Sequence, residues 1–112
     1  MAVVLPPVIA AFVQAKNDFN VEAIIDCLTD DAVVEDEGQE LRGQAAIKSW
    51  LKKTHEQYND TLAVISCEAD GEQHIVTAQV SGDFEGSPVP LDFCFVTKEA
   101  KISSLRIRLH GE

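Results

Sequence analysis

The spacing of apolar residues predicts three helices in the first part of the chain. Apolar side chains recur at helical spacing over 8–15, directly after Pro6-Pro7, which can open a helix because the first helical turn needs no N–H from proline. Asn20 is placed to cap a second helix over 21–28. A third apolar stripe, over 43–58, has lysines on its other side and predicts a third helix.

From residue 61 onward the pattern changes to the alternation of apolar and polar residues that is typical of strands. Helices followed by such a meander indicate an α+β fold, in which a curved, mostly antiparallel sheet packs over three helices. The chain has no linker or repeat, so 1–112 is expected to form one domain. The predicted strands are a short one over 32–36 and four longer ones over 61–68, 73–84, 89–97 and 101–109.

A strongly curved sheet has a concave side that its own side chains do not fill, so we expect an apolar pocket with a few polar groups. Asp92 is one candidate for such a group. It lies in a strand whose two faces are both largely apolar, so its carboxyl group must be paired, hydrogen-bonded or neutral. It is either a structural aspartate, held by backbone groups or by an arginine such as Arg106, or a functional one.

Asp36 is the second candidate, because it ends the 32–36 strand on the same face as Val34. It is either a turn aspartate that bonds its own backbone or a general base at the mouth of the pocket. Two carboxyl groups in unequal environments, one wet and one dry, would divide the acid and base roles of a reaction.

His55 of the third helix is a further candidate acid or base, with a surface or core position as the alternative, whereas His74 fits an exposed position at the start of a strand and His110 lies in the tail. No His, Cys, Asp or Glu residues have the spacing of a metal site, and there is no glycine-rich phosphate loop. Neither a metal nor a cofactor is therefore expected.

Charge and cysteine content narrow the partners and the compartment. Nine basic and nineteen acidic residues give a formal net charge of −10, which repels phosphate backbones and anionic lipid, so neither nucleic acid nor a membrane is expected as a partner. The three cysteines are an odd number and have no CxxC spacing, so they fit neither a disulfide framework nor a zinc site. They favour free, buried thiols in a reducing cytoplasm.

Two strand faces combine apolar, polar and charged residues. They indicate either solvent exposure of an antiparallel sheet or a twofold sheet-to-sheet contact, and we favour a homodimer. One face comprises Ile75, Thr77, Gln79 and Ser81, and the other includes Arg106 and Arg108.

Two segments of the chain resemble a known family. They are TDDAVVED over 29–36 and LRGQAAI over 41–47. With the order of helices and strands, they are similar to the nuclear transport factor 2-like superfamily, especially its SnoaL-like and ketosteroid-isomerase-like branches. The resemblance implies a cone-shaped fold, a deep apolar pocket and homodimerisation through the sheet.

Within that superfamily, Val34-Glu35-Asp36 resembles the segment that carries the general base of ketosteroid isomerase, and Pro90-Leu91-Asp92-Phe93 resembles the segment that carries its protonated oxyanion-hole aspartate. The resemblance therefore implies Asp36 as base and Asp92 as a protonated hydrogen-bond donor. Phe12 and Leu51 stand where that enzyme has pocket tyrosines. Since loss of one oxyanion donor typically costs ~10²–10³ in rate, a true steroid isomerase is not expected.

The sequence thus predicts a protein that holds a small apolar molecule, as an isomerase, cyclase or hydratase that uses the two aspartates. The alternative is a non-catalytic ligand-binding or dimeric assembly module with a vestigial pocket. In addition to Asp36 and Asp92, the residues expected to contact the ligand are Phe12, Val34, Trp50, Leu51, His55, Phe84 and Leu105.

Overall fold

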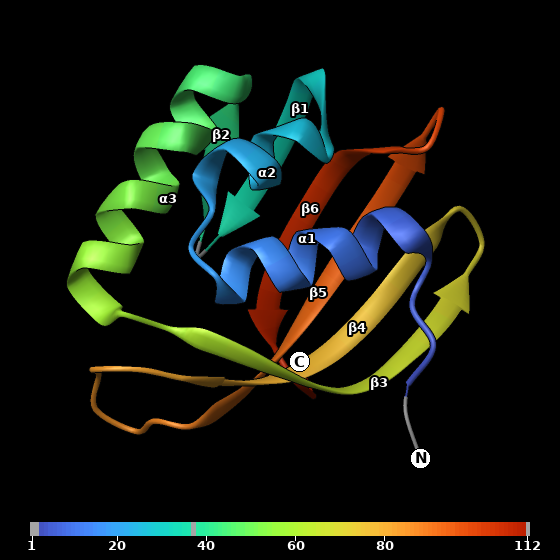
Figure 1. The fold of residues 1–112 in the computed structure, drawn as a ribbon. Helices are drawn as coiled ribbons and strands as arrows, with labels where there is room; N and C mark the ends of the chain where they lie inside the picture. The colour runs from blue at the N-terminus through green and yellow to red at the C-terminus, as the bar shows by residue number, and fades with distance from the viewer. Residues whose placement is uncertain (1–2, 37, 112) are drawn as a thin grey trace.

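A computed structural model describes residues 3–36 and 38–111, in which three helices pack on one face of a six-stranded sheet (Figure 1). This arrangement confirms the expected α+β class. The helices are α1 (Pro7–Asn17), α2 (Val21–Asp26) and α3 (Gln44–Tyr58). The strands are β1 (Leu28–Asp36), β2 (Gln39–Arg42), β3 (Thr61–Asp70), β4 (Gln73–Ser81), β5 (Val89–Lys98) and β6 (Lys101–Leu109).

The strands lie in the order β2-β1-β6-β5-β4-β3. Strands β1 and β6 pair in parallel, and every other neighbouring pair is antiparallel. Figure 1 shows a strongly curved sheet, with α1 lying across its helix-facing side. The opposite side, which we call the outer face, has no described helix on it.

Several element boundaries differ from the sequence-based prediction. Helix α2 ends at Asp26 instead of residue 28, and β1 begins at Leu28 instead of 32. Leu28 is drawn into the strand because it pairs with Ile102 of β6, whose N–H donates to the Cys27 carbonyl at 2.7 Å. In addition, β2 was not predicted, and β4 ends at Ser81 instead of 84. Each difference depends on a strand partner that local periodicity does not reveal.

The core lies between the helices and the concave side of the sheet. The ring of Phe12 on α1 meets the ring of Phe95 on β5 edge to face, with centroids 5.4 Å apart. Ile9, Ile24 and Phe95 are almost completely removed from water, and this burial is the main force that holds the helices on the sheet. None of the helices in the described ranges is long and apolar enough to span a membrane.

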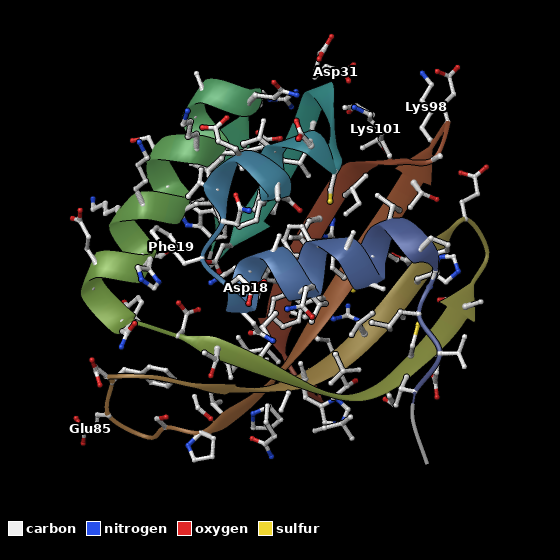
Figure 2. The ribbon with its side chains drawn as sticks, viewed as in Figure 1. Asp18, Phe19, Asp31, Glu85, Lys98 and Lys101 are labelled. Atoms are coloured by element: carbon white, nitrogen blue, oxygen red, sulfur yellow. The ribbon has the colours of Figure 1, made fainter. Side chains whose placement is uncertain are left out.

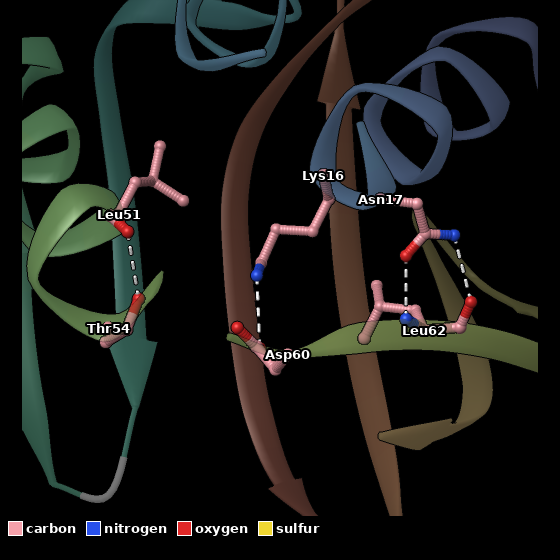
Figure 3. Close-up of polar contacts among 6 residues, drawn as sticks. All are labelled: Lys16, Asn17, Leu51, Thr54, Asp60 and Leu62. Carbon is pink, nitrogen blue, oxygen red and sulfur yellow. Dashed lines mark hydrogen bonds and ion pairs between the residues drawn. The ribbon is translucent and has the colours of Figure 1, made fainter. Parts of the chain in front are cut away.

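Polar side chains attach the end of α1 to the start of β3 (Figure 3). The Asn17 side chain accepts a hydrogen bond from the Leu62 N–H at 2.7 Å and donates one to the Leu62 carbonyl at 2.9 Å. One residue earlier, the Lys16 ammonium lies 3.1 Å from a carboxylate oxygen of Asp60. These contacts fix where α1 lies over the concave side.

Candidate functional site

The residues predicted to contact a ligand fall into two groups on the helix-facing side. Trp50 and Phe84 are half-buried and pack against the core. His55 is also half-buried. The other four are at most 4% exposed, so they form the floor of the concave side and present little free surface. This buried group comprises Phe12, Val34, Leu51 and Leu105.

Asp36 is the last residue of β1 and lies on the helix-facing side. It is paired in register with Ile107 of β6, which is in turn paired with Phe93 of β5. Cross-strand partners project to the same face of a sheet, and both Ile107 and Phe93 belong to or pack against the core. Asp36 is half-buried, so its carboxyl group lies at the margin of an apolar surface, which suits a general base.

Asp92 lies on the opposite face of the sheet. Its strand neighbour Phe93 projects into the core, and successive residues of a strand point to opposite faces. Asp92 is paired in register with Thr77 of β4 and Arg108 of β6. The Thr77 hydroxyl donates to Asp92 Oδ1 at 2.7 Å, and His110 Nδ1 lies 2.8 Å from the same oxygen.

This environment favours the charged form of Asp92. Burial by itself raises the pKa of the carboxyl group. The hydrogen bonds from Thr77 and His110 and the positive charges of His110 and Arg108 lower the pKa, and together they outweigh the effect of burial. The net result is a pKa below the ordinary value for aspartate. The structure therefore corrects two predictions: Asp92 is not placed in one pocket with Asp36, and it is not a protonated donor.

The geometry fits the alternative in which Asp92 is a structural aspartate held by hydrogen bonds, although its partners differ from those expected. Arg106, which was expected to hold Asp92, pairs instead with Glu35 at 2.9 Å. His110, interpreted from the sequence as a tail residue, is one of the actual partners. Only the register of β4, β5 and β6 brings these side chains together.

His55 lies on α3 with its ring stacked on Phe19, at a centroid distance of 3.5 Å and an interplanar angle of 9°. Figure 2 shows Phe19 beside α3, in the segment that leaves α1. Within residues 3–36 and 38–111, His55 Nδ1 is buried and has no hydrogen-bond partner. The sequence left open whether His55 is structural or functional, and its ring is half-buried and stacked on Phe19.

Sequence reasoning missed the buried pair formed by Lys16 and Asp60. Their side chains are 9% and 15% exposed, and their charged atoms are 3.1 Å apart. Asp60 Oδ1 is buried and without a partner among the described residues. One signal was available: Lys16 follows Phe12 by four positions, so both belong to the buried face of the same helix.

Two surface clefts lie away from these residues. One is lined by 28–31 together with Lys98, Glu99 and Lys101, several of which are labelled in Figure 2. The other lies between the chain segment 4–7 and residues Cys67, Ala69 and His74. Neither cleft includes a predicted ligand contact, so the apolar pocket on the concave side remains a prediction.

Metal-binding clusters and reactive thiols are the other kinds of chemical group that a site could use. In the part of the chain that the structure describes, no three His, Cys, Asp or Glu side chains form a cluster able to hold a metal ion. All three cysteines are free. Burial raises the pKa of the Cys27, Cys67 and Cys94 thiols, which disfavours the nucleophilic thiolate.

Comparisons with known proteins agree with this fold. A model of the SnoaL-like domain matches residues 9–101. A candidate polyketide cyclase from Sinorhizobium meliloti is 33% identical, with a TM-score of 0.90, over 93% of this chain and 95% of that chain. No curated protein sequence matches the chain.

Two further solved structures, each less than a quarter identical, share the fold. A candidate polyketide cyclase from Pseudomonas putida is 21% identical, with a TM-score of 0.79, over 98% of this chain and 94% of that chain. A protein with a ketosteroid isomerase-like fold from Catenulispora acidiphila, solved with trimethylamine, is 20% identical, with a TM-score of 0.82, over 94% of this chain and 86% of that chain.

Proposed function

The chain belongs to the SnoaL-like domain family of the nuclear transport factor 2-like superfamily, and from that membership we propose that it binds a small, largely apolar molecule on the concave side of its sheet. The protein would transfer a proton within that molecule, with Asp36 as general base. The observation that carries the proposal is the placement of Asp36 at the end of β1. Its half-buried carboxyl group lies on the helix-facing side, in register with Ile107.

Partly exposed apolar side chains around the core support a ligand of this kind. They are half-buried and pack against the core, so they retain surface that a ligand would cover. They come from four different elements, which would let them contact a molecule from several sides. These side chains are Leu41, Trp50, Leu91 and Ile107.

The reaction that fits this site is proton abstraction next to a carbonyl group. Asp36 would take a proton from the carbon, and the bonding electrons would move through the new C=C bond onto the carbonyl oxygen as an enolate. In a β,γ-unsaturated carbonyl compound the enolate is a conjugated dienolate, and its reprotonation at the γ-carbon gives isomerisation. In a compound with a second carbonyl group, attack of the enolate carbon on that carbonyl gives cyclisation and an alkoxide that takes up the proton. Asp36 would return its proton to complete the cycle. No cofactor is needed for either outcome.

A non-catalytic ligand-binding module is the alternative, and specific residues favour it. Phe12 and Leu51 bring no hydroxyl group to the concave side, and Asp92 lies on the outer face. An enolate would therefore need another electrostatic partner, because such stabilisation is usually the largest single contribution to catalysis.

Hydrogen–deuterium exchange at carbon tests the catalytic proposal. We expect the protein to accelerate exchange of the protons next to the carbonyl of 2-tetralone, followed by NMR, and Asp36→Asn to reduce that acceleration by about 10²–10⁴. Asp31→Asn, an exposed position of the same strand, is the matched control and should retain it. Binding of 2-tetralone without any acceleration would favour the binding module.

A further inference from the structure

Lys16 supplies a charged donor on the helix face where Phe12 supplies none. The two residues are one turn apart on α1 and project to the same side. Both are buried, at 7% and 4% exposure. An ammonium group in such a position is costly to bury unless it is paired.

The pairing with Asp60 leaves hydrogen-bonding capacity unused. One carboxylate oxygen of Asp60 accepts from the Lys16 ammonium, which has three donors. The other oxygen, Asp60 Oδ1, is buried and has no partner among residues 3–36 and 38–111. Buried acceptors are almost always satisfied in proteins, and this oxygen is free to accept a hydrogen bond from a further donor.

The backbone at Asp60 is tightly packed. Asp60 lies at the corner between α3 and β3, and Gly82 packs directly against that corner. A Cβ atom at Gly82 would lie 2.6 Å from the Tyr58 carbonyl oxygen and 3.2 Å from the Asp60 Cα. Beside it, the ring of Phe84 meets the ring of Tyr58 at a centroid distance of 5.8 Å. The backbone that carries Asp60 is thus held in place beside an aromatic pair.

We propose that Lys16 and Asp60 form a subsite for a phenolic or enolic hydroxyl group of the ligand. The hydroxyl would donate to Asp60 Oδ1, and its oxygen would accept from Lys16 Nζ. The substrate class is then a hydroxylated aromatic compound or an enolised carbonyl compound. This inference rests on the proposed apolar ligand site and deepens it, because the Lys16 charge would stabilise a developing oxyanion.

A pair of matched probes tests the subsite. Affinities for 2-naphthol and for 2-methylnaphthalene, which has a similar size but no hydroxyl group, are measured by fluorescence titration. We expect the protein to bind 2-naphthol at least about tenfold more tightly, since a site built for a hydroxyl group discriminates against an analogue that lacks it.

The double variant Lys16→Met/Asp60→Asn removes both charges together and leaves no unpaired buried ion. It should bind the two probes with equal affinity, close to that of the unaltered protein for 2-methylnaphthalene. Lys48→Met removes a lysine from the exposed pair with Glu22 and should retain the preference. Thermal unfolding confirms that each variant is folded.

The outcomes separate this proposal from the proposed function. Equal affinity for the two probes in the unaltered protein, or a preference that survives in the double variant, would overturn the subsite alone. Failure of both probes to bind would overturn the apolar ligand site and the subsite together. The readout is affinity and does not depend on catalysis by Asp36.

Discussion

Asp92 carries its charge on the face of the sheet that the helices leave uncovered. Its two side-chain partners, Thr77 and His110, come from β4 and from the chain after β6. A buried carboxylate is tolerated only where hydrogen bonds or opposite charges compensate its desolvation. The contacts with Thr77 and His110 lower the pKa of Asp92, so we expect this residue to have a structural role.

Replacing Thr77 with Val should destabilise the protein, because it removes a hydrogen bond to a charged group while keeping the side-chain shape. We expect a loss of about 1.5–3 kcal/mol in the free energy of unfolding at pH 7, measured by urea denaturation. Thr61→Val, at an exposed position of β3, should change it by less than about 0.5 kcal/mol.

The Thr77→Val deficit should also depend on pH. A carboxyl group whose pKa is lowered by folding stabilises the protein above its unfolded pKa of about 3.9, and this contribution is lost as the pH falls through the folded pKa. The difference between Thr77→Val and the unaltered protein should therefore shrink below pH ~4. A deficit that stays constant down to pH 2 would contradict an ionised Asp92.

At the scale of elements, two polar contacts link α1 to the start of β3 and to the residue before it, although these segments are far apart in the sequence. The Asn17 side chain satisfies both backbone groups of Leu62, and Lys16 pairs with Asp60. These bonds set the position of α1 over the concave side. Burial of Phe12 alone would restrict movement of the helix along the sheet less strongly. The proposed hydroxyl subsite depends on that position.

We expect Asn17→Ala to lower the free energy of unfolding by about 1–3 kcal/mol, because it removes two hydrogen bonds to the Leu62 backbone. Gln14→Ala, in the same helix, removes only an exposed contact with Asp18 and should cost less than about 0.5 kcal/mol. Thermal or urea denaturation of the two variants provides the comparison. Equal effects would show that the link to β3 adds nothing beyond helix propensity.

At the scale of the whole molecule, the outer face of the sheet is the surface without a helical layer (Figure 1). Ile75 is half-buried there, in register with Cys94. Gln79 Oε1 is buried without a partner among the described residues, and Arg106 and Arg108 are exposed. Apolar, amide and charged groups on one face suit a self-complementary twofold contact.

We therefore expect a homodimer at micromolar concentration, with a mass by light scattering of twice the 12.2 kDa of one chain. Ile75→Glu should give the monomer, because the twofold axis would bring two added carboxylates close together in a chain that already has a net charge of −10. Ala10→Glu, at an exposed position of α1, is the control and should remain dimeric. A monomeric mass for the unaltered protein would show that the outer face is simply solvated.

The sequence by itself determined the elements that depend on local periodicity. The apolar stripes located α1 and α3, and alternation correctly placed Val34 and Asp36 on one face of β1. These features follow from the repeats of the helix and the strand, which nearby residues are sufficient to show. Together with the motifs over 29–47, they were enough to predict the fold family.

Only the tertiary structure decided which face of β5 meets the helices. Both faces of that strand are largely apolar, so alternation could not tell whether Phe93 or Asp92 points inward, and pairing with β4 and β6 settled it. The Lys16–Asp60 pair likewise joins residues 44 positions apart. Such contacts arise when packing brings distant segments together, and no local pattern records them.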